Sequence, residues 1–205
     1  MKVSTKSENF LWVGNDPAID FANTEIVQDG KVVDLLAKSQ DLLDWLAASA
    51  LISGVRLEGS AGAFRNAELK KALIHARDYR SVLKSALNAL SEGGSIRKEK
   101  VAIAETNRLL AEPRATFTLS PEKVLQLRQD WIIREADDFI RPIAFAFARL
   151  LTRQDVGRIH KCQNPECVLF FLDTSKSSTR AWCSMDICGN KLRVAAFRRR
   201  QAGQQ

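Results

Sequence analysis

Apolar residues recur every three or four positions over four long stretches of the chain, a spacing that places them on one side of a helix. In the longest stretch Leu73, Leu83 and Leu87 share such a side, and Gly93-Gly94 follows as a stop signal. The pattern predicts four helices, over residues 34–50, 64–90, 97–111 and 131–152. Pro142 falls inside the last of them and predicts a kink there.

Shorter segments alternate apolar and polar residues, which is typical of strands. Asp16 and Pro17 have the residue types of a helix cap and first helical position, so a helix of one or two turns should end before Thr24. Asp29-Gly30 indicates a tight turn. Strands or hairpins are predicted over residues 9–14, 25–33 and 116–127. The last hairpin should turn apolar side chains into a core and pair with the early strands.

All four cysteines lie in the last quarter of the chain, in two pairs of identical spacing. They are Cys162, Cys167, Cys183 and Cys188. Four thiolates can complete a closed tetrahedral zinc site, and two ligands separated by four residues can turn back onto one ion. The spacing therefore predicts one structural zinc ion per chain. Clustering on this scale disfavours four unrelated core cysteines.

A disulfide framework is the competing explanation, and it belongs to oxidising compartments. Residues 1–15 contain Lys2 and Lys6 but no apolar core of a signal peptide, and no stretch approaches the ~18 consecutive apolar residues of a membrane span. We therefore expect a cytoplasmic protein without membrane contact, in which metal is favoured over disulfide.

Positive charge is concentrated at the cysteine-bearing end. Residues 1–157 have a net charge of +1, whereas 158–205 have +6. A zinc ion with four thiolates is itself dianionic, so the metal-loaded module would carry about +4. The surplus lies in an arm of seventeen residues after Cys188, which has five basic side chains and no acidic one. If this arm is helical, Lys191 and Arg198 share one side and Arg193 and Arg200 another.

Between the two cysteine pairs, residues 168–172 are predicted to form a strand and 180–182 a returning strand. Ser184 is placed to cap a following helix. The predicted fold class is α+β: a mainly helical domain with a small antiparallel sheet over residues 1–157, and a zinc-anchored β-hairpin followed by a helix over 158–205.

Two segments resemble known families. Residues 171–176, 180–185 and Cys188-Gly189-Asn190-Lys191 are similar to the CGNR zinc finger, and residues 14–24 resemble the opening of the ABATE domain that precedes this finger in bacterial proteins. The resemblance implies a bacterial transcriptional regulator, often described as stress-related, whose finger binds DNA through zinc held by the four cysteines. It also implies that the larger domain senses something.

The basic residues predicted to contact nucleic acid are Lys176, Arg180, Lys191, Arg193, Arg198, Arg199 and Arg200. Two positions depart from the family pattern. Lys191 replaces the arginine of the motif, and Ala181 stands where another basic residue is common. Because lysine lacks the bidentate fork of arginine, these changes weaken base-specific contact more than general attraction to phosphate.

The resemblance places the family's Asp-x-x-Asn-Thr on Asp20, Asn23 and Thr24. Asp20 and Asn23 are candidate ligand-binding residues for a small-molecule effector, with Arg80 as a further candidate that could instead partner Asp20. The alternative is that they cap the first helix and tie it to the sheet.

No catalytic constellation is present: the chain has no phosphate-binding glycine loop and no G-x-S-x-G, and His75 sits at an ordinary mid-helix position. We therefore expect a regulator and not an enzyme. Alternatives that the sequence leaves open are RNA in place of DNA, and a zinc-stabilised module for protein interaction or homo-oligomerisation.

Overall fold

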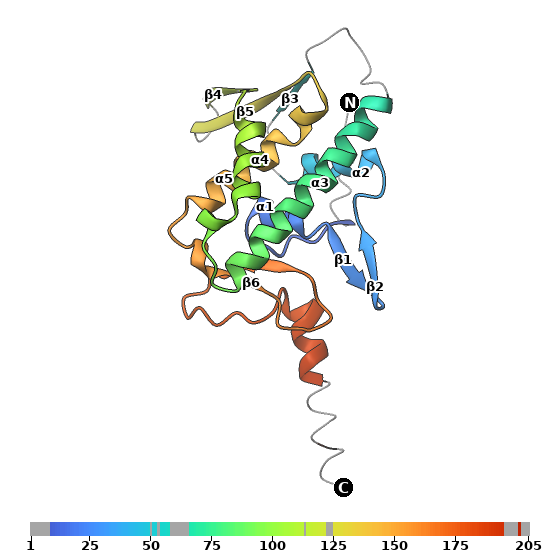
Figure 1. Cartoon of the computed structure of the whole chain (residues 1–205), viewed down its shortest axis with the longest axis vertical. Helices are drawn as coiled ribbons and strands as arrows, with labels where there is room; N and C mark the ends of the chain where they lie inside the picture. Colours follow the sequence, from blue (N-terminus) through green and yellow to red (C-terminus); the bar gives the residue numbers. More distant parts are fainter. Residues whose placement is uncertain are drawn as a thin grey trace.

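The computed structural model of the 205-residue chain describes residues 9–49, 51–52, 54–57, 66–112, 114–121, 125–194 and 201. It confirms the α+β class, and Figure 1 shows helices around one long helix, α3, with the cysteine-bearing segment at the lower end. The helices are α1 (Pro17–Ala22), α2 (Ser39–Ala48), α3 (Asn66–Ser91), α4 (Lys100–Leu110) and α5 (Arg141–Leu151). Short 3-10 turns are η2 (Ile96–Lys98), η3 (Ala136–Phe139) and η4 (Val156–Arg158), and a π-turn, η5, spans Met185–Gly189.

In the described residues, seven strands form three small sheets. They are β1 (Glu25–Gln28), β2 (Lys31–Asp34), β3 (Gly54–Leu57), β4 (Ala115–Pro121), β5 (Leu125–Ile133), β6 (Ile159–Lys161) and β7 (Phe170–Leu172). β1 pairs with β2 and β6 with β7, both antiparallel. β5 pairs antiparallel with β4 and parallel with β3.

The helical periodicity located the main helices well. α3 buries Leu73, Leu83 and Leu87 as one apolar stripe, as the spacing predicts. It ends at Ser91, and Gly93, two residues later, has a φ of +79°, the left-handed conformation that commonly follows the end of a helix. The cap of α1 is also confirmed, because the Asp16 carboxylate accepts from the Ala18 N–H at 2.9 Å.

Several boundaries and partners differ from the predictions. Residues 9–14 form no strand. The helix predicted from residue 34 begins at Ser39, because Asp34 belongs to β2 and residues 35–38 form the connection. Residues 131–133 belong to β5, so Pro142 lies in the first turn of α5, where it starts the helix and does not kink it.

The predicted hairpin over 116–127 is present as β4 and β5, but its surroundings are different from those expected. It pairs with β3 and not with the early strands β1 and β2, which form a sheet of their own. Its apolar side chains Phe117, Leu119, Leu125 and Leu127 are between 57% and 68% exposed, so the prediction that they enter a core is wrong.

One apolar core extends from the first helix into the cysteine-bearing segment. Phe21, Trp45 and Phe147 are fully buried near its centre. Phe170 and Leu172 of β7 belong to the same cluster. Burial of apolar surface is the main stabilising term in folding, so the segment after residue 157 contributes to the stability of the whole chain.

Arg80 forms a buried ion pair on the inner side of α3. Its guanidinium donates to both carboxylate oxygens of Asp34, each at 2.7 Å, and to the Thr24 hydroxyl at 3.0 Å. Burial acts to raise the pKa of Asp34, but the hydrogen bonds from Arg80 and the Leu36 N–H hold it below its usual value. The expectation that Arg80 binds a ligand or partners Asp20 is therefore corrected: it anchors the end of β2 to α3.

Replacement Arg80→Met should lower the free energy of unfolding by about 2 kcal/mol, since it removes two charge-assisted hydrogen bonds to Asp34, which keeps only its more exposed partner Arg77. Urea denaturation measures the change. The matched control is Lys84→Met one turn along α3, whose ammonium contacts the half-exposed Glu25 and should cost less than about 1 kcal/mol. Equal losses in the two variants would contradict this role of Arg80.

Candidate metal centre and its docking to the helical domain

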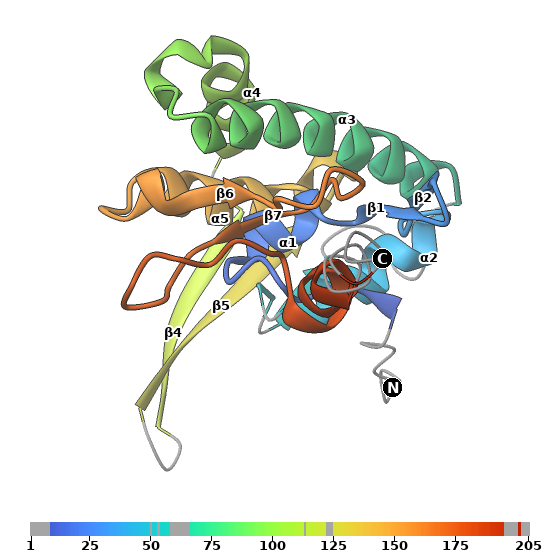
Figure 2. The same ribbon diagram turned by 90° about the horizontal axis from the view of Figure 1, so that it is seen from below.

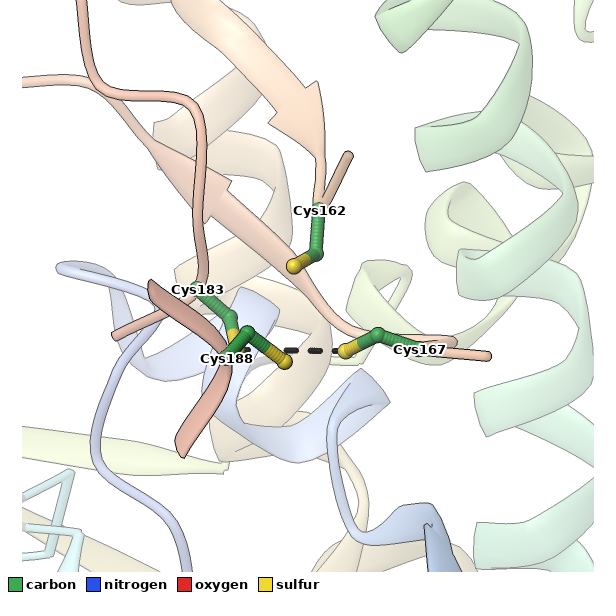
Figure 3. A group of neighbouring side chains, drawn as sticks. All are labelled: Cys162, Cys167, Cys183 and Cys188. Atoms are coloured by element: carbon green, nitrogen blue, oxygen red, sulfur yellow. Dashed lines mark hydrogen bonds between the residues drawn. The ribbon is translucent and has the colours of Figure 1, made fainter. Parts of the chain in front are cut away.

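The four cysteine sulfurs converge on one point. Figure 3 shows the side chains of Cys162, Cys167, Cys183 and Cys188 turned toward a common centre, and their sulfur atoms all lie within 4.8 Å of one another. The sulfurs of Cys167 and Cys183 are 3.8 Å apart. Three of the four cysteines are buried, and none forms a disulfide.

This geometry fits a tetrahedral metal ion. With a Zn–S bond of about 2.3 Å, neighbouring sulfurs of a tetrahedral site are about 3.8 Å apart, whereas a disulfide bond is about 2.05 Å long. Four thiols this close cannot all ionise without a compensating charge, which a divalent cation supplies. The four residues predicted from spacing are therefore brought together as a metal-binding set.

The first cysteine pair lies in the loop between β6 and β7. The Cys162 N–H donates to the Leu169 carbonyl at 2.9 Å, closing this loop at its base. The loop is thus a hairpin connection, and residues 180–182 form no strand, which corrects the predicted partner of β7. β7 pairs instead with β6, which leads directly into Cys162.

Asn164 links the two cysteine pairs, a role that the sequence reasoning missed. Its backbone carbonyl accepts from the Cys167 N–H at 2.8 Å, and its side-chain oxygen accepts from the Glu166 N–H at 3.2 Å. Its side-chain amide donates to the sulfur of Cys188 at 3.3 Å. An asparagine two residues after a ligand is a turn signal that could have pointed to this position.

The second pair is held by the turn η5 and the helix that follows. The Ser184 hydroxyl accepts from the Asp186 N–H at 3.1 Å, so the predicted cap is confirmed. At Gly189 an added Cβ would lie 2.6 Å from the Met185 sulfur and 2.9 Å from the Trp182 ring. Any larger residue at this position of the Cys-Gly-Asn motif would displace Met185 or Trp182, so glycine suits the close packing beside Cys188.

Asn23 fastens the metal-binding segment to α1. Its side-chain amide donates to the Phe170 carbonyl at 2.9 Å, and its side-chain oxygen accepts from the Phe170 N–H at 2.9 Å. The Leu172 N–H donates to the Gly14 carbonyl at 2.8 Å. Asn23 is only 1% exposed. Of the two interpretations of this residue, the structure supports the tie between elements, since both polar groups of its side chain are occupied.

Asp20 is also turned inward. One of its carboxylate oxygens accepts from the Gly14 N–H at 2.7 Å, and the side chain is buried beneath residues 13 and 14. Burial raises its pKa to about 6, against the opposing effect of the hydrogen bonds from Gly14 and Val13. Asp20 therefore caps the segment that leads into α1, which leaves it little access to an effector.

Arg180 is placed differently from the prediction. Its guanidinium lies 4.2 Å from the centroid of the Phe171 ring and donates to the carbonyls of Val13 at 2.6 Å, Trp182 at 3.1 Å and Cys183. These contacts tie the second cysteine pair to residue 13. These contacts favour an internal, positioning role for Arg180 over the predicted contact with nucleic acid.

The other predicted cations that the structure describes lie at the surface. Lys176, Lys191 and Arg193 are exposed. The Lys191 ammonium is 3.3 Å from a Glu166 carboxylate oxygen, an exposed pair of little strength. Arg198, Arg199 and Arg200 lie outside the described residues.

Two family models match the chain in succession. Residues 15–154 match the ABATE family, described as "Putative stress-induced transcription regulator", and residues 158–201 match the CGNR zinc finger. The chain belongs to the ABATE family. No curated protein matches it. Both resemblances noted in the sequence are thus confirmed, and all four cysteines lie within the segment that matches the CGNR zinc finger.

The ABATE region and the finger meet along a groove beside the metal centre. A cavity of about 570 Å³ is lined by Leu11 and Ile26 on one side and by Leu169, Ile187 and Lys191 on the other. Asp20, Asn23 and Arg80 are not among its lining residues. Among the helices that the structure describes, none is long and apolar enough to cross a membrane.

The metal centre should hold one equivalent of zinc per chain and should support the shared core. Cys183→Ser should abolish stoichiometric binding. Asn164→Ala keeps all four ligands but removes the side-chain hydrogen bonds to the Cys188 sulfur and from the Glu166 N–H, and it should weaken affinity by roughly 10- to 100-fold. Competition with a chromophoric chelator measures both. Retention of wild-type affinity by Cys183→Ser would refute the four-cysteine site.

The raised pKa of Asp20 predicts a specific dependence of stability on pH. Between about pH 4 and pH 6 the folded protein holds a proton that the unfolded chain has lost, so stability falls as the pH rises, by at most about 1.4 kcal/mol per unit. Asp20→Asn should flatten this part of the profile while keeping the acceptor for Gly14. Urea titrations at several pH values test it, and identical slopes in both proteins would contradict it.

Proposed function

We propose that this ABATE-family protein is a bacterial, cytoplasmic transcription regulator that binds DNA through its finger and basic arm, with one structural zinc ion per chain. The observation that carries the proposal is the distribution of charge. The ABATE region is nearly neutral, whereas all five charged residues after Cys188 are basic. Phosphate contacts by such cations supply most of the affinity of DNA-binding proteins.

The metal centre positions the start of this arm. The helix that follows Cys188 continues through Val194, and its exposed cations Lys191 and Arg193 point away from the core. Docking by Asn23 and Arg180 fixes the helix relative to the ABATE region. We assign DNA contact to Lys191, Arg193, Arg198, Arg199 and Arg200, with Lys176 as a lesser contact from the turn.

Sensing of a small effector is the second part of the proposal. The residues first considered for it are engaged in internal bonds, so the groove between β1 and the finger is the better candidate. A mainly apolar ligand there would touch Ile26 of the ABATE region and Ile187 and Lys191 of the finger at once. Occupancy of the groove would thereby alter how the arm is presented.

An interaction module is the alternative function. Met185, Ile187 and Val194 are exposed apolar residues on the finger, a feature that suits a protein partner. The other apolar side of the finger, at Phe170 and Leu172, is already buried against the chain itself. This leaves a smaller surface for a partner than a free finger would have.

The DNA hypothesis predicts a salt-dependent affinity that resides in the arm. Arg198→Ala with Arg199→Ala should reduce the slope of log K against log salt by roughly 2, because each lost phosphate contact removes about 0.9. The control is Lys70→Ala with Lys71→Ala, which removes two adjacent exposed cations from α3 and should leave the slope unchanged.

Fluorescence anisotropy with a duplex of random sequence measures both slopes. Absence of binding at low salt, or equal effects of the two double variants, would overturn the assignment. Tighter binding of an RNA of the same length would transfer the function to RNA. Selection of bound sequences from a random pool then tests whether recognition extends beyond phosphate.

A further inference from the structure

The β4–β5 hairpin extends well beyond the rest of its sheet. β3 pairs only with residues 130–133 of β5, so from residue 129 to the tip the hairpin is a two-stranded ribbon. Figure 2 shows this ribbon projecting from the body of the molecule. A two-stranded ribbon without a covered apolar face is marginally stable in water.

One face of the ribbon is apolar and uncovered. Leu119 lies directly opposite Leu127, and Phe117 and Leu125 are two positions away on the same strands, so all four side chains share one face. They are 57% to 68% exposed. Toward the base, the same face continues into Trp131, which is buried against Phe145 at a ring distance of 6.0 Å.

Charge is absent from this face. Its other members are Ala115, Pro121 and Gln129, while Arg128 and Asp130 lie on the opposite face of β5. Alternation of this kind is typical of a strand with one face in a core. The described part of the chain nevertheless supplies no element that covers the outer half of that face.

We propose that a second copy of the chain covers this face, the two ribbons packing face to face about a twofold axis. An uncharged apolar surface is complementary to itself, as an isologous interface requires. The four side chains expose on the order of 500 Å² of accessible surface in one copy. Two copies packed face to face would therefore bury about 1,000 Å² in total, which reaches the lower limit for a specific interface.

The position of the ribbon favours a second copy. Figure 1 shows the ribbon at the upper end of the molecule and the finger helix at the lower end. Because the net positive charge belongs to the finger end, association through the ribbons keeps the two cationic modules far apart. The dimer would therefore present two separate arms, a number that suits paired half-sites if the arms bind DNA.

Sedimentation equilibrium from about 1 to 100 μM tests the dimer directly. Wild type should approach twice the chain mass within this range. Leu119→Lys should weaken association at least tenfold, because it places a charge at the centre of the apolar face. Thr118→Lys is the matched control: it adds the same charge at the neighbouring exposed position on the opposite face and should leave association unchanged.

A further variant, Leu119→Thr with Leu127→Thr, keeps residues that favour strands and removes only apolar surface, and it should also be monomeric. Circular dichroism of each variant confirms its fold. A monomeric wild type at 100 μM would overturn the proposal and would favour a different protein as the partner of this face. Equal association of Leu119→Lys and Thr118→Lys would also overturn it, by placing any dimer interface elsewhere. Neither result depends on DNA.

Discussion

The paired hydrogen bonds between Asn23 and the backbone of Phe170 are the contact on which the arrangement of the molecule depends. They are fully buried, where an unpaired amide or carbonyl costs far more than it does in water. They set strand β7 against α1, and β7 connects the two cysteine pairs. These contacts therefore fix the position of the metal centre, and of the helix that follows it, relative to the first helix of the chain.

Local signals predicted the metal ligands, the caps and most helices. The cysteine spacing, the Ser184 cap and the apolar stripe of α3 depend on residues close together in sequence, and each is found as expected. The packing role of Gly189 is not predicted, although its close neighbours, Met185 and Trp182, are only a few positions away.

Long-range partners were beyond such reasoning. In the sequence, Arg80 and Arg180 cannot be distinguished from exposed arginines. Arg80 nevertheless pairs with Asp34, and Arg180 donates to the carbonyl of Val13, which is distant in the chain. The prediction that the β4–β5 hairpin enters a core was wrong for a related reason. Its alternation correctly indicates a strand with an apolar face, but the pattern does not specify whether the covering surface belongs to the same chain.

The division of the chain into two domains at residue 157 stays a prediction. The two segments share one apolar core, which independent domains would not do. Phe170 and Leu172 fill space in the same cluster as Phe21 and Trp45. Exchange of the finger for an unrelated DNA-binding module would therefore leave a gap beside α1 and an unsatisfied amide at Asn23. In evolutionary terms, the two family segments are constrained to change together, since each supplies part of the other's interior.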